Sequence, residues 1–86
     1  MQESNWFVYI IKCGDNSLYT GITTNIPRRL KQHKSGKGAK YTKGRGEFQL
    51  VYSETQPDKS SALKREIEIK SMKKPLKLEL INNFNG

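Results

Sequence analysis

The chain has 86 residues, 34% of them hydrophobic and 28% charged, which suits one small domain with a thin core. No apolar run approaches the roughly 18 residues that a membrane-spanning helix needs, and no signal-peptide core follows Met1. The single cysteine, Cys13, excludes an internal disulfide and a cysteine-based zinc site. We therefore expect one cytoplasmic domain over residues 1–86, with no membrane partner.

The positive charge is concentrated in one segment. Sixteen lysines and arginines against eight acids give a net charge of +8, and residues 28–46 hold eight of these bases and no acid. The bases of this segment are Arg28, Arg29, Lys31, Lys34, Lys37, Lys40, Lys43 and Arg45. A block of like charge indicates a polyanionic partner, which we weigh above a basic face that only confers solubility.

Two strands joined by a hairpin are expected at the start of the chain. Residues 6–12 (WFVYIIK) are apolar on both alternating faces, which is typical of a central strand. Residues 14–16 supply a turn, and residues 18–23 (LYTGIT) alternate as a second strand. This loop would place Tyr9 opposite Gly21 and Ile11 opposite Tyr19, so that two phenols share a sheet face with a glycine.

A helix, a basic loop and a third strand are expected next. Thr24 or Asn25 caps a helix that runs to about residue 35 and ends at Gly36. Residues 36–46 contain four glycines and four bases and indicate a loop. Residues 47–54 form the third strand, with Phe48, Leu50 and Tyr52 alternating against polar or smaller residues.

Two helices complete the chain after a break at residues 56–58. Ser60 or Ser61 caps a helix through about Lys73, the Lys74–Pro75 pair interrupts it, and residues 76–84 form a short helix. The order ββαβαα predicts an α+β fold, a small three-stranded antiparallel sheet flanked by helices.

Charged residues lie on the apolar side of both main helices. At about 100° per residue, the predicted buried sector of residues 62–70 is marked by Ala62, Leu63, Ile67 and Ile69. Glu66 and Lys70 fall inside this sector, where a carboxylate needs a partner. An ion pair between them and a functional carboxylate at Glu66 are weighed about equally.

The helix that starts near Asn25 shows a similar pattern. Ile26 and Leu30 mark its apolar stripe, and Arg29 and His33 lie beside that stripe. Arg28, Lys31 and Gln32 point away. A lone histidine on an apolar face is most often a core residue, but an arginine one turn away in a basic chain favours a functional role.

These residues together resemble the GIY-YIG nuclease superfamily. Its two motifs correspond to Phe7-Val8-Tyr9 and Tyr19-Thr20-Gly21, with Phe7 where the family has glycine and Thr20 where it has isoleucine. An arginine and a histidine follow at residues 29 and 33. The loop at 36–40 and the helix at 62–66 are similar to the stand-alone bacterial UPF0213/YhbQ-like group, related to the Slx1-type nuclease domain. The resemblance covers residues 6–80.

The resemblance implies a role for each matching residue. Tyr9 would help to activate the attacking water, Tyr19 would support it, and Gly21 would shape the pocket floor. Arg29 would stabilise the transferring phosphoryl group, His33 would assist proton transfer, and Glu66 would bind one divalent metal, Mg²⁺ or alternatively Mn²⁺. The nucleic-acid contacts expected from charge are Arg28, Lys31, Lys34, Lys37, Lys40, Lys43, Arg45 and Lys70.

We therefore expect a Mg²⁺-dependent endonuclease that hydrolyses phosphodiester bonds in DNA, on nicked, branched or single-stranded substrates. RNA stays open as the substrate. One alternative is a nucleic-acid-binding module of the same fold with little or no catalysis. A weaker alternative is an accessory subunit that needs a protein partner, which would supply substrate specificity.

Overall fold

The computed structural model describes residues 5–34 and 48–84. The elements in chain order are β1 (Trp6–Cys13), β2 (Leu18–Thr23), α1 (Ile26–Lys34), β3 (Phe48–Gln56), α2 (Lys59–Lys70) and α3 (Lys74–Asn82). The three strands form one antiparallel sheet in the order β2-β1-β3. The predicted α+β fold is confirmed, and β1 is its central strand.

The β1–β2 hairpin has the predicted register. Tyr9 pairs with Gly21, and Ile11 pairs with Tyr19. The turn is closed by the Asn16 N–H, which donates to the Cys13 carbonyl at 2.8 Å. Asn16 has a φ of 70°, a left-handed conformation that asparagine tolerates better than most residues. Both phenols and Gly21 therefore share a face of the sheet.

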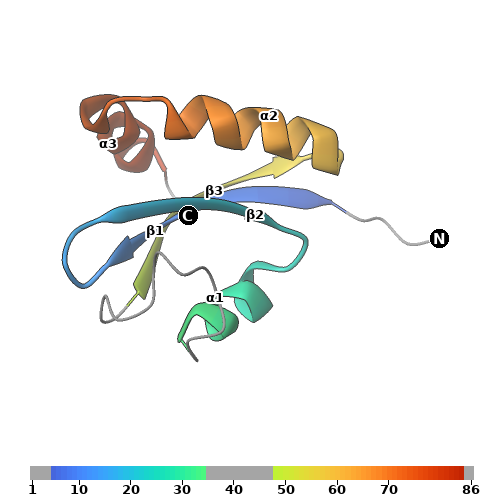
Figure 1. The fold of residues 1–86 in the computed structure, drawn as a ribbon, viewed down its shortest axis with the longest axis horizontal. Helices are drawn as coiled ribbons and strands as arrows, with labels where there is room; N and C mark the ends of the chain where they lie inside the picture. The colour runs from blue at the N-terminus through green and yellow to red at the C-terminus, as the bar shows by residue number, and fades with distance from the viewer. Residues whose placement is uncertain (1–4, 35–47, 85–86) are drawn as a thin grey trace.

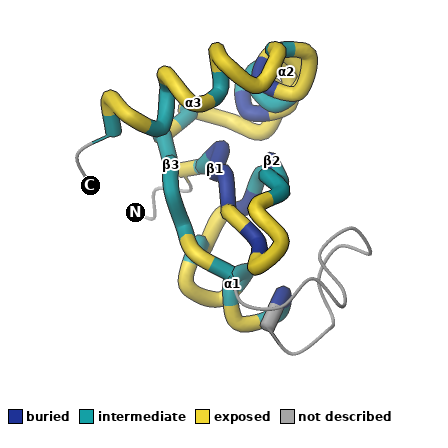
Figure 2. Tube along the Cα trace, turned by 90° about the vertical axis from the view of Figure 1, so that its left-hand side faces the viewer, coloured by how far each residue is buried: buried dark blue, intermediate teal, exposed yellow. Residues whose placement is uncertain are grey.

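Helices cover both faces of the sheet (Figure 1). On one face, Val8 and Ile10 of β1 pack with Ala62 and Ile69 of α2, and residues of α3 complete this core. The other face carries Tyr9 and Ile11 and is covered by α1. Figure 2 shows that the buried part of the trace follows β1. Burial of both faces of β1 explains why its sequence is apolar at successive positions.

A bulge in β3 changes the predicted alternation. Ile10 pairs with Tyr52 but Ile11 pairs with Leu50, so Val51 is an extra residue in β3. Phe48 and Leu50 therefore lie on the α1 face, whereas Tyr52 lies on the α2 face and packs against the core there. The expectation that Phe48, Leu50 and Tyr52 alternate regularly is wrong at the bulge. The strand also extends to Gln56, into the predicted break.

The ends of α2 differ from the prediction. The N-cap is Asp58, whose Oδ1 accepts the Ser61 N–H at 2.8 Å, so neither predicted serine caps the helix. The helix ends at Lys70 instead of about Lys73. Pro75 lies in the first turn of α3, where its missing N–H costs nothing, so the Lys74–Pro75 pair begins a helix.

The buried side of α2 is also rotated from the predicted sector. Ala62 and Ile69 are fully buried, but Leu63 is 40% exposed and Ile67 is 66% exposed. On the flank of this rotated side, Arg65 forms an ion pair with Glu54 of β3 at 3.0 Å. Contact through the small Ala62 and the Arg65–Glu54 ion pair both orient α2, and the periodicity of apolar residues does not indicate the ion pair.

No helix within residues 5–34 and 48–84 is long and apolar enough to cross a membrane. Cytoplasmic location and the extent of the domain over residues 1–86 stay predictions.

The rotation of α2 predicts a large difference between two isoleucines two residues apart. Ile69→Ala should lower the free energy of unfolding by about 2–5 kcal/mol, because it leaves a cavity against β1. Ile67→Ala should change it by less than about 0.5 kcal/mol, because this side chain is mostly in solvent. Urea unfolding of both variants measures the difference, and equal losses would contradict the rotated packing.

Candidate active site

A cluster of polar side chains lies under the sheet, between β1, β2 and α1. Tyr9 comes from the middle of β1, Tyr19 from β2 and His33 from the last turn of α1. The Tyr9 hydroxyl lies 3.0 Å from His33 Nε2, and the ring centroids of Tyr19 and His33 are 5.3 Å apart. Three residues separated by up to 24 positions in sequence therefore meet at one point.

The cluster is shielded from solvent. Tyr9 is 1% exposed and His33 is 2% exposed. Phe48, the first residue of β3, meets the His33 ring edge-on at a centroid distance of 5.9 Å. Aromatic edges on two sides hold the imidazole in one orientation. Sequence reasoning missed Phe48 because only the pairing of β3 with β1 brings it to this face.

Burial and neighbouring charges shift the pKa values of His33 and Tyr9. Burial, with a smaller effect from the Arg29 guanidinium, lowers the pKa of His33, so the imidazole is neutral near pH 7. Burial raises the pKa of Tyr9, while a hydrogen bond from Arg29 acts against this rise. Arg29 has only N–H donors, so the Tyr9 oxygen accepts this hydrogen bond, and the same oxygen lies within hydrogen-bond distance of Nε2 of the neutral His33.

Gly21 provides the space for this arrangement. A Cβ atom at residue 21 would lie 2.7 Å from the Tyr9 hydroxyl oxygen, 2.9 Å from Tyr9 Cζ and 3.0 Å from Tyr19 Cε2. Real Cβ atoms essentially never approach other heavy atoms this closely. The Tyr9 ring thus lies across Gly21, toward the β2 edge of the sheet. Only glycine leaves both phenols in these positions.

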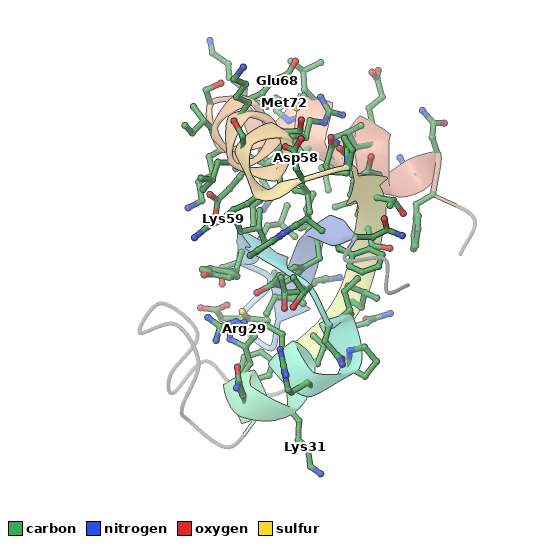
Figure 3. The ribbon with its side chains drawn as sticks, turned by 90° about the vertical axis from the view of Figure 1, so that its right-hand side faces the viewer. Arg29, Lys31, Asp58, Lys59, Glu68 and Met72 are labelled. Atoms are coloured by element: carbon green, nitrogen blue, oxygen red, sulfur yellow. The ribbon has the colours of Figure 1, made fainter. Side chains whose placement is uncertain are left out.

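Arg29 is directed toward the sheet, whereas its neighbours on α1 are not. Figure 3 shows Arg29 on the sheet side and Lys31 extending away from the molecule. Arg28 and Lys31 are exposed, and Arg29 is half-buried. Arg29 Nη1 also donates to Gln32 Oε1 at 2.9 Å. Gln32 was predicted to point away, but the i,i+3 spacing on a helix allows it to hold the guanidinium.

Glu66 approaches from the opposite side of the hairpin. It belongs to α2, which packs against β2 and β1, and its side chain is 16% exposed. Lys70 Nζ lies 3.3 Å from Glu66 Oε2, so the i,i+4 ion pair is present. Lys70 itself is 53% exposed, contrary to its predicted place in the buried sector. The negative charge of Glu66 still contributes to the raised pKa of Tyr9, behind burial and Tyr19.

Only part of the predicted nucleic-acid surface can be placed. Arg28 and Lys31 lie on the exposed side of α1, and Lys34 is the last residue of this helix. Four more predicted contacts lie outside the described residues, namely Lys37, Lys40, Lys43 and Arg45. Within the described part of the chain, no group of three or more histidine, cysteine or acidic side chains gathers to hold a metal.

The sequence match to a protein family gives the class of the domain, which is nuclease-type. A family model described as the GIY-YIG catalytic domain matches residues 5–82, so the chain belongs to the GIY-YIG family. This family generally uses a divalent metal.

Within the family, the chain is similar to the UPF0213 proteins. It is 55% identical over 75 residues to a UPF0213 protein of Staphylococcus haemolyticus, covering 87% of this chain and 92% of that protein. It is 50% identical over 81 residues to UPF0213 protein YhbQ of Escherichia coli, covering 94% and 81%. The solution structure of a UPF0213 protein from Bacillus halodurans has a TM-score of 0.62 and 48% identity, covering 95% and 87% of the chains.

Neutral His33 predicts a specific pH dependence of stability. The pKa of His33 is lowered in the folded state and has its ordinary value of about 6.5 in the unfolded state. Below about pH 6.5 the unfolded state therefore binds more protons than the folded state. Stability from this residue is thus complete above about pH 6.5 and is lost as the pH falls toward the folded-state pKa. His33 is the single histidine of the chain, so His33→Asn removes the effect.

Urea unfolding of both proteins from pH 8 to pH 5 measures this effect. Above pH 7 the wild type should have a higher free energy of unfolding than His33→Asn. This difference in free energy should become smaller as the pH falls toward 5. A constant difference across this range would mean that His33 titrates alike in the folded and unfolded states.

Gly21→Ala should destabilise the fold by roughly 1–3 kcal/mol, because the added methyl group displaces the Tyr9 ring. Tyr9→Phe removes the oxygen at 2.7 Å and should recover part of this loss in the double variant. A double-mutant cycle from urea unfolding measures the recovery. Strict additivity of the two losses would show that the Tyr9 hydroxyl does not set the requirement for glycine.

Proposed function

We propose that this domain is a Mg²⁺-dependent endonuclease that hydrolyses phosphodiester bonds in DNA, with nicked, branched or single-stranded DNA as its substrates. The observation that carries this proposal is the hydrogen-bonded chain from Arg29 through the Tyr9 hydroxyl to His33. It joins a cation able to bind phosphate to an acid–base pair able to move a proton.

The proton path follows from the hydrogen bonds. A phenol with a raised pKa is a weak base by itself at neutral pH. With His33 in the tautomer that accepts at Nε2, Tyr9 can pass its proton to Nε2 as it accepts one from the attacking water. Tyr9 then acts as a relay and His33 as the acceptor. Tyr19, half-buried beside them, supports the position of the water.

Arg29 supplies positive charge where the phosphate becomes more negative. A hydrogen bond to Tyr9 raises the pKa of Arg29, so the guanidinium stays charged at any working pH. Its planar group has five donors, and a contact with Tyr9 and Gln32 leaves others for two phosphate oxygens. The contact with Gln32 holds the group in place before substrate binds, which favours transition-state stabilisation.

The donor set fits one Mg²⁺ ion at Glu66. A half-buried carboxylate is a hard oxygen ligand, and Mg²⁺ keeps several waters when it binds through one or two carboxylates. The present partner of the carboxylate, Lys70, is half-exposed and can move away. A bound Mg²⁺ supplies Lewis-acid stabilisation of charge on the phosphate oxygens. Mn²⁺ has similar ligand preferences and is the expected substitute.

Positive charge outside the cluster supports a DNA partner. Arg28, Lys31 and Lys34 extend the charge of Arg29 along α1, and residues 37–45 continue the basic segment in sequence. RNA offers the same phosphates, so cleavage of matched DNA and RNA strands decides the substrate. A protein partner that supplies specificity is compatible with the small size of the domain.

A plasmid-nicking assay of two glutamine variants tests the function. Glu66→Gln should reduce nicking with Mg²⁺ by about 10²-fold or more, because it removes the charge of the expected metal ligand. Glu68→Gln is a matched control on the same helix, since Glu68 is 61% exposed and pairs with Arg65. It should retain nicking, and EDTA should abolish nicking by the wild type.

Loss of nicking in both variants to the same degree would reject Glu66 as the metal ligand. DNA binding by the wild type without any nicking in Mg²⁺ or Mn²⁺ would favour the binding module of the same fold.

A further inference from the structure

A basic hollow lies at the turn end of the β1–β2 hairpin. It has a volume of about 520 Å³ and lies between the β1–β2 turn, β3 and α3. Figure 1 shows α3 above this end of the sheet. The size falls within the range of about 300–1,000 Å³ that is usual for ligand sites. We refer to this hollow as the α3 cleft.

The lining of the α3 cleft combines positive charge, amides and an apolar wall. Lys12 and Lys74 supply the charge, and Asn16, Gln49 and Asn82 supply side-chain amides. Among the described residues that line it, none is acidic. A smaller hollow of about 240 Å³ is lined by both Lys74 and Lys77. The first turn of α3, which carries these lysines, also contains no acid, which favours an anion there.

The apolar wall distinguishes the cleft from a simple phosphate contact. Leu78 and Ile81 of α3 line it on one side, and Leu78 is 43% exposed. A phosphate alone makes no favourable contact with an apolar surface. A nucleotide has both an anionic group and a flat base that can pack on it. Side-chain amides are the usual partners for base edges. The chemistry of the cleft therefore matches a phosphate joined to a base.

We propose that the α3 cleft binds one unpaired nucleotide of a nucleic-acid strand, with its phosphate at Lys12 and Lys74 and its base against Leu78. The base must be unpaired, because the face of a paired base is covered by its neighbours in the stack. This proposal rests on the proposed function, since the strand bound in the cleft is the substrate strand.

The position of the cleft supports a single strand over a duplex. Lys12 lies three residues beyond Tyr9 on β1, roughly 10 Å along the strand, and its side chain points to the opposite face of the sheet. A strand that contacts both places must turn around the end of the hairpin. A single strand bends this sharply, whereas a duplex resists bending over so short a length. The cleft would thus select substrates with a single-stranded segment near the cleaved bond.

Binding in EDTA tests the cleft without cleavage. The probes are a fluorescent 12-nucleotide thymidine strand and a hairpin duplex of equal length, measured by anisotropy. Lys12→Gln/Lys74→Gln should weaken binding of the single strand by about tenfold or more, and should reduce its salt slope by about 0.7, the value for one phosphate of a single strand. Lys59→Gln/Lys64→Gln, an equal charge change on α2, should have a smaller effect.

Leu78→Ser tests the base contact separately. It should weaken single-strand binding about threefold or more with no change in salt slope, and leave duplex binding unchanged, because it removes only apolar surface. Its side chain is 43% exposed, so the fold should tolerate the change, which a thermal melt checks. With pentathymidine as the probe, NMR shifts should move at the amides of Asn16 and Gln49.

Several results would overturn the proposal. These are equal effects of the two double variants, equal losses for single strand and duplex, an unchanged affinity in Leu78→Ser, or NMR shifts outside the cleft. These outcomes are distinct from failure of the proposed function. A protein that binds the single strand through the cleft but nicks nothing would reject only the endonuclease, and a protein that nicks DNA with a silent cleft would reject only the cleft.

Discussion

The close approach of the Tyr9 hydroxyl to Gly21 is the constraint on which the candidate site depends. No Cβ atom fits at residue 21, and this absence lets the Tyr9 ring lie across β2 and reach His33 at 3.0 Å. The same hydroxyl receives a hydrogen bond from Arg29. One steric condition in the sheet therefore positions a phenol, an imidazole and a guanidinium that come from two different elements.

The two faces of β1 carry different groups, core side chains on one face and a phenol of the candidate site on the other. Because side chains alternate along β1, Val8 and Ile10 enter the core under α2 while Tyr9 enters the site under α1. The core is small, with four fully buried members in its central cluster, so the site also contributes packed aromatic rings. Tyr9 and His33 are nearly as buried as the core, and their hydrogen bond to each other offsets the cost of removing polar groups from water.

Apart from the ends of α2, the features that sequence reasoning missed involve contacts between elements. The bulge at Val51 moves Tyr52 to the α2 face, and a regular alternation gives no sign of it. Leu63 and Ile67 are apolar yet exposed, because Ala62 and the Arg65–Glu54 ion pair orient α2 instead. Phe48 reaches His33 only through the pairing of β3 with β1.

Local chemistry in the sequence was enough to predict the order of elements, the hairpin register and the direction of Arg29 toward the sheet. These depend on turn residues, on alternation in a strand and on the periodicity of one helix, which are properties of neighbouring residues. The tertiary structure decided the hydrogen-bonded chain through Tyr9, the rotation of α2 and the lining of the α3 cleft. Each of these requires groups distant in sequence to meet, and packing between elements determines which groups do so.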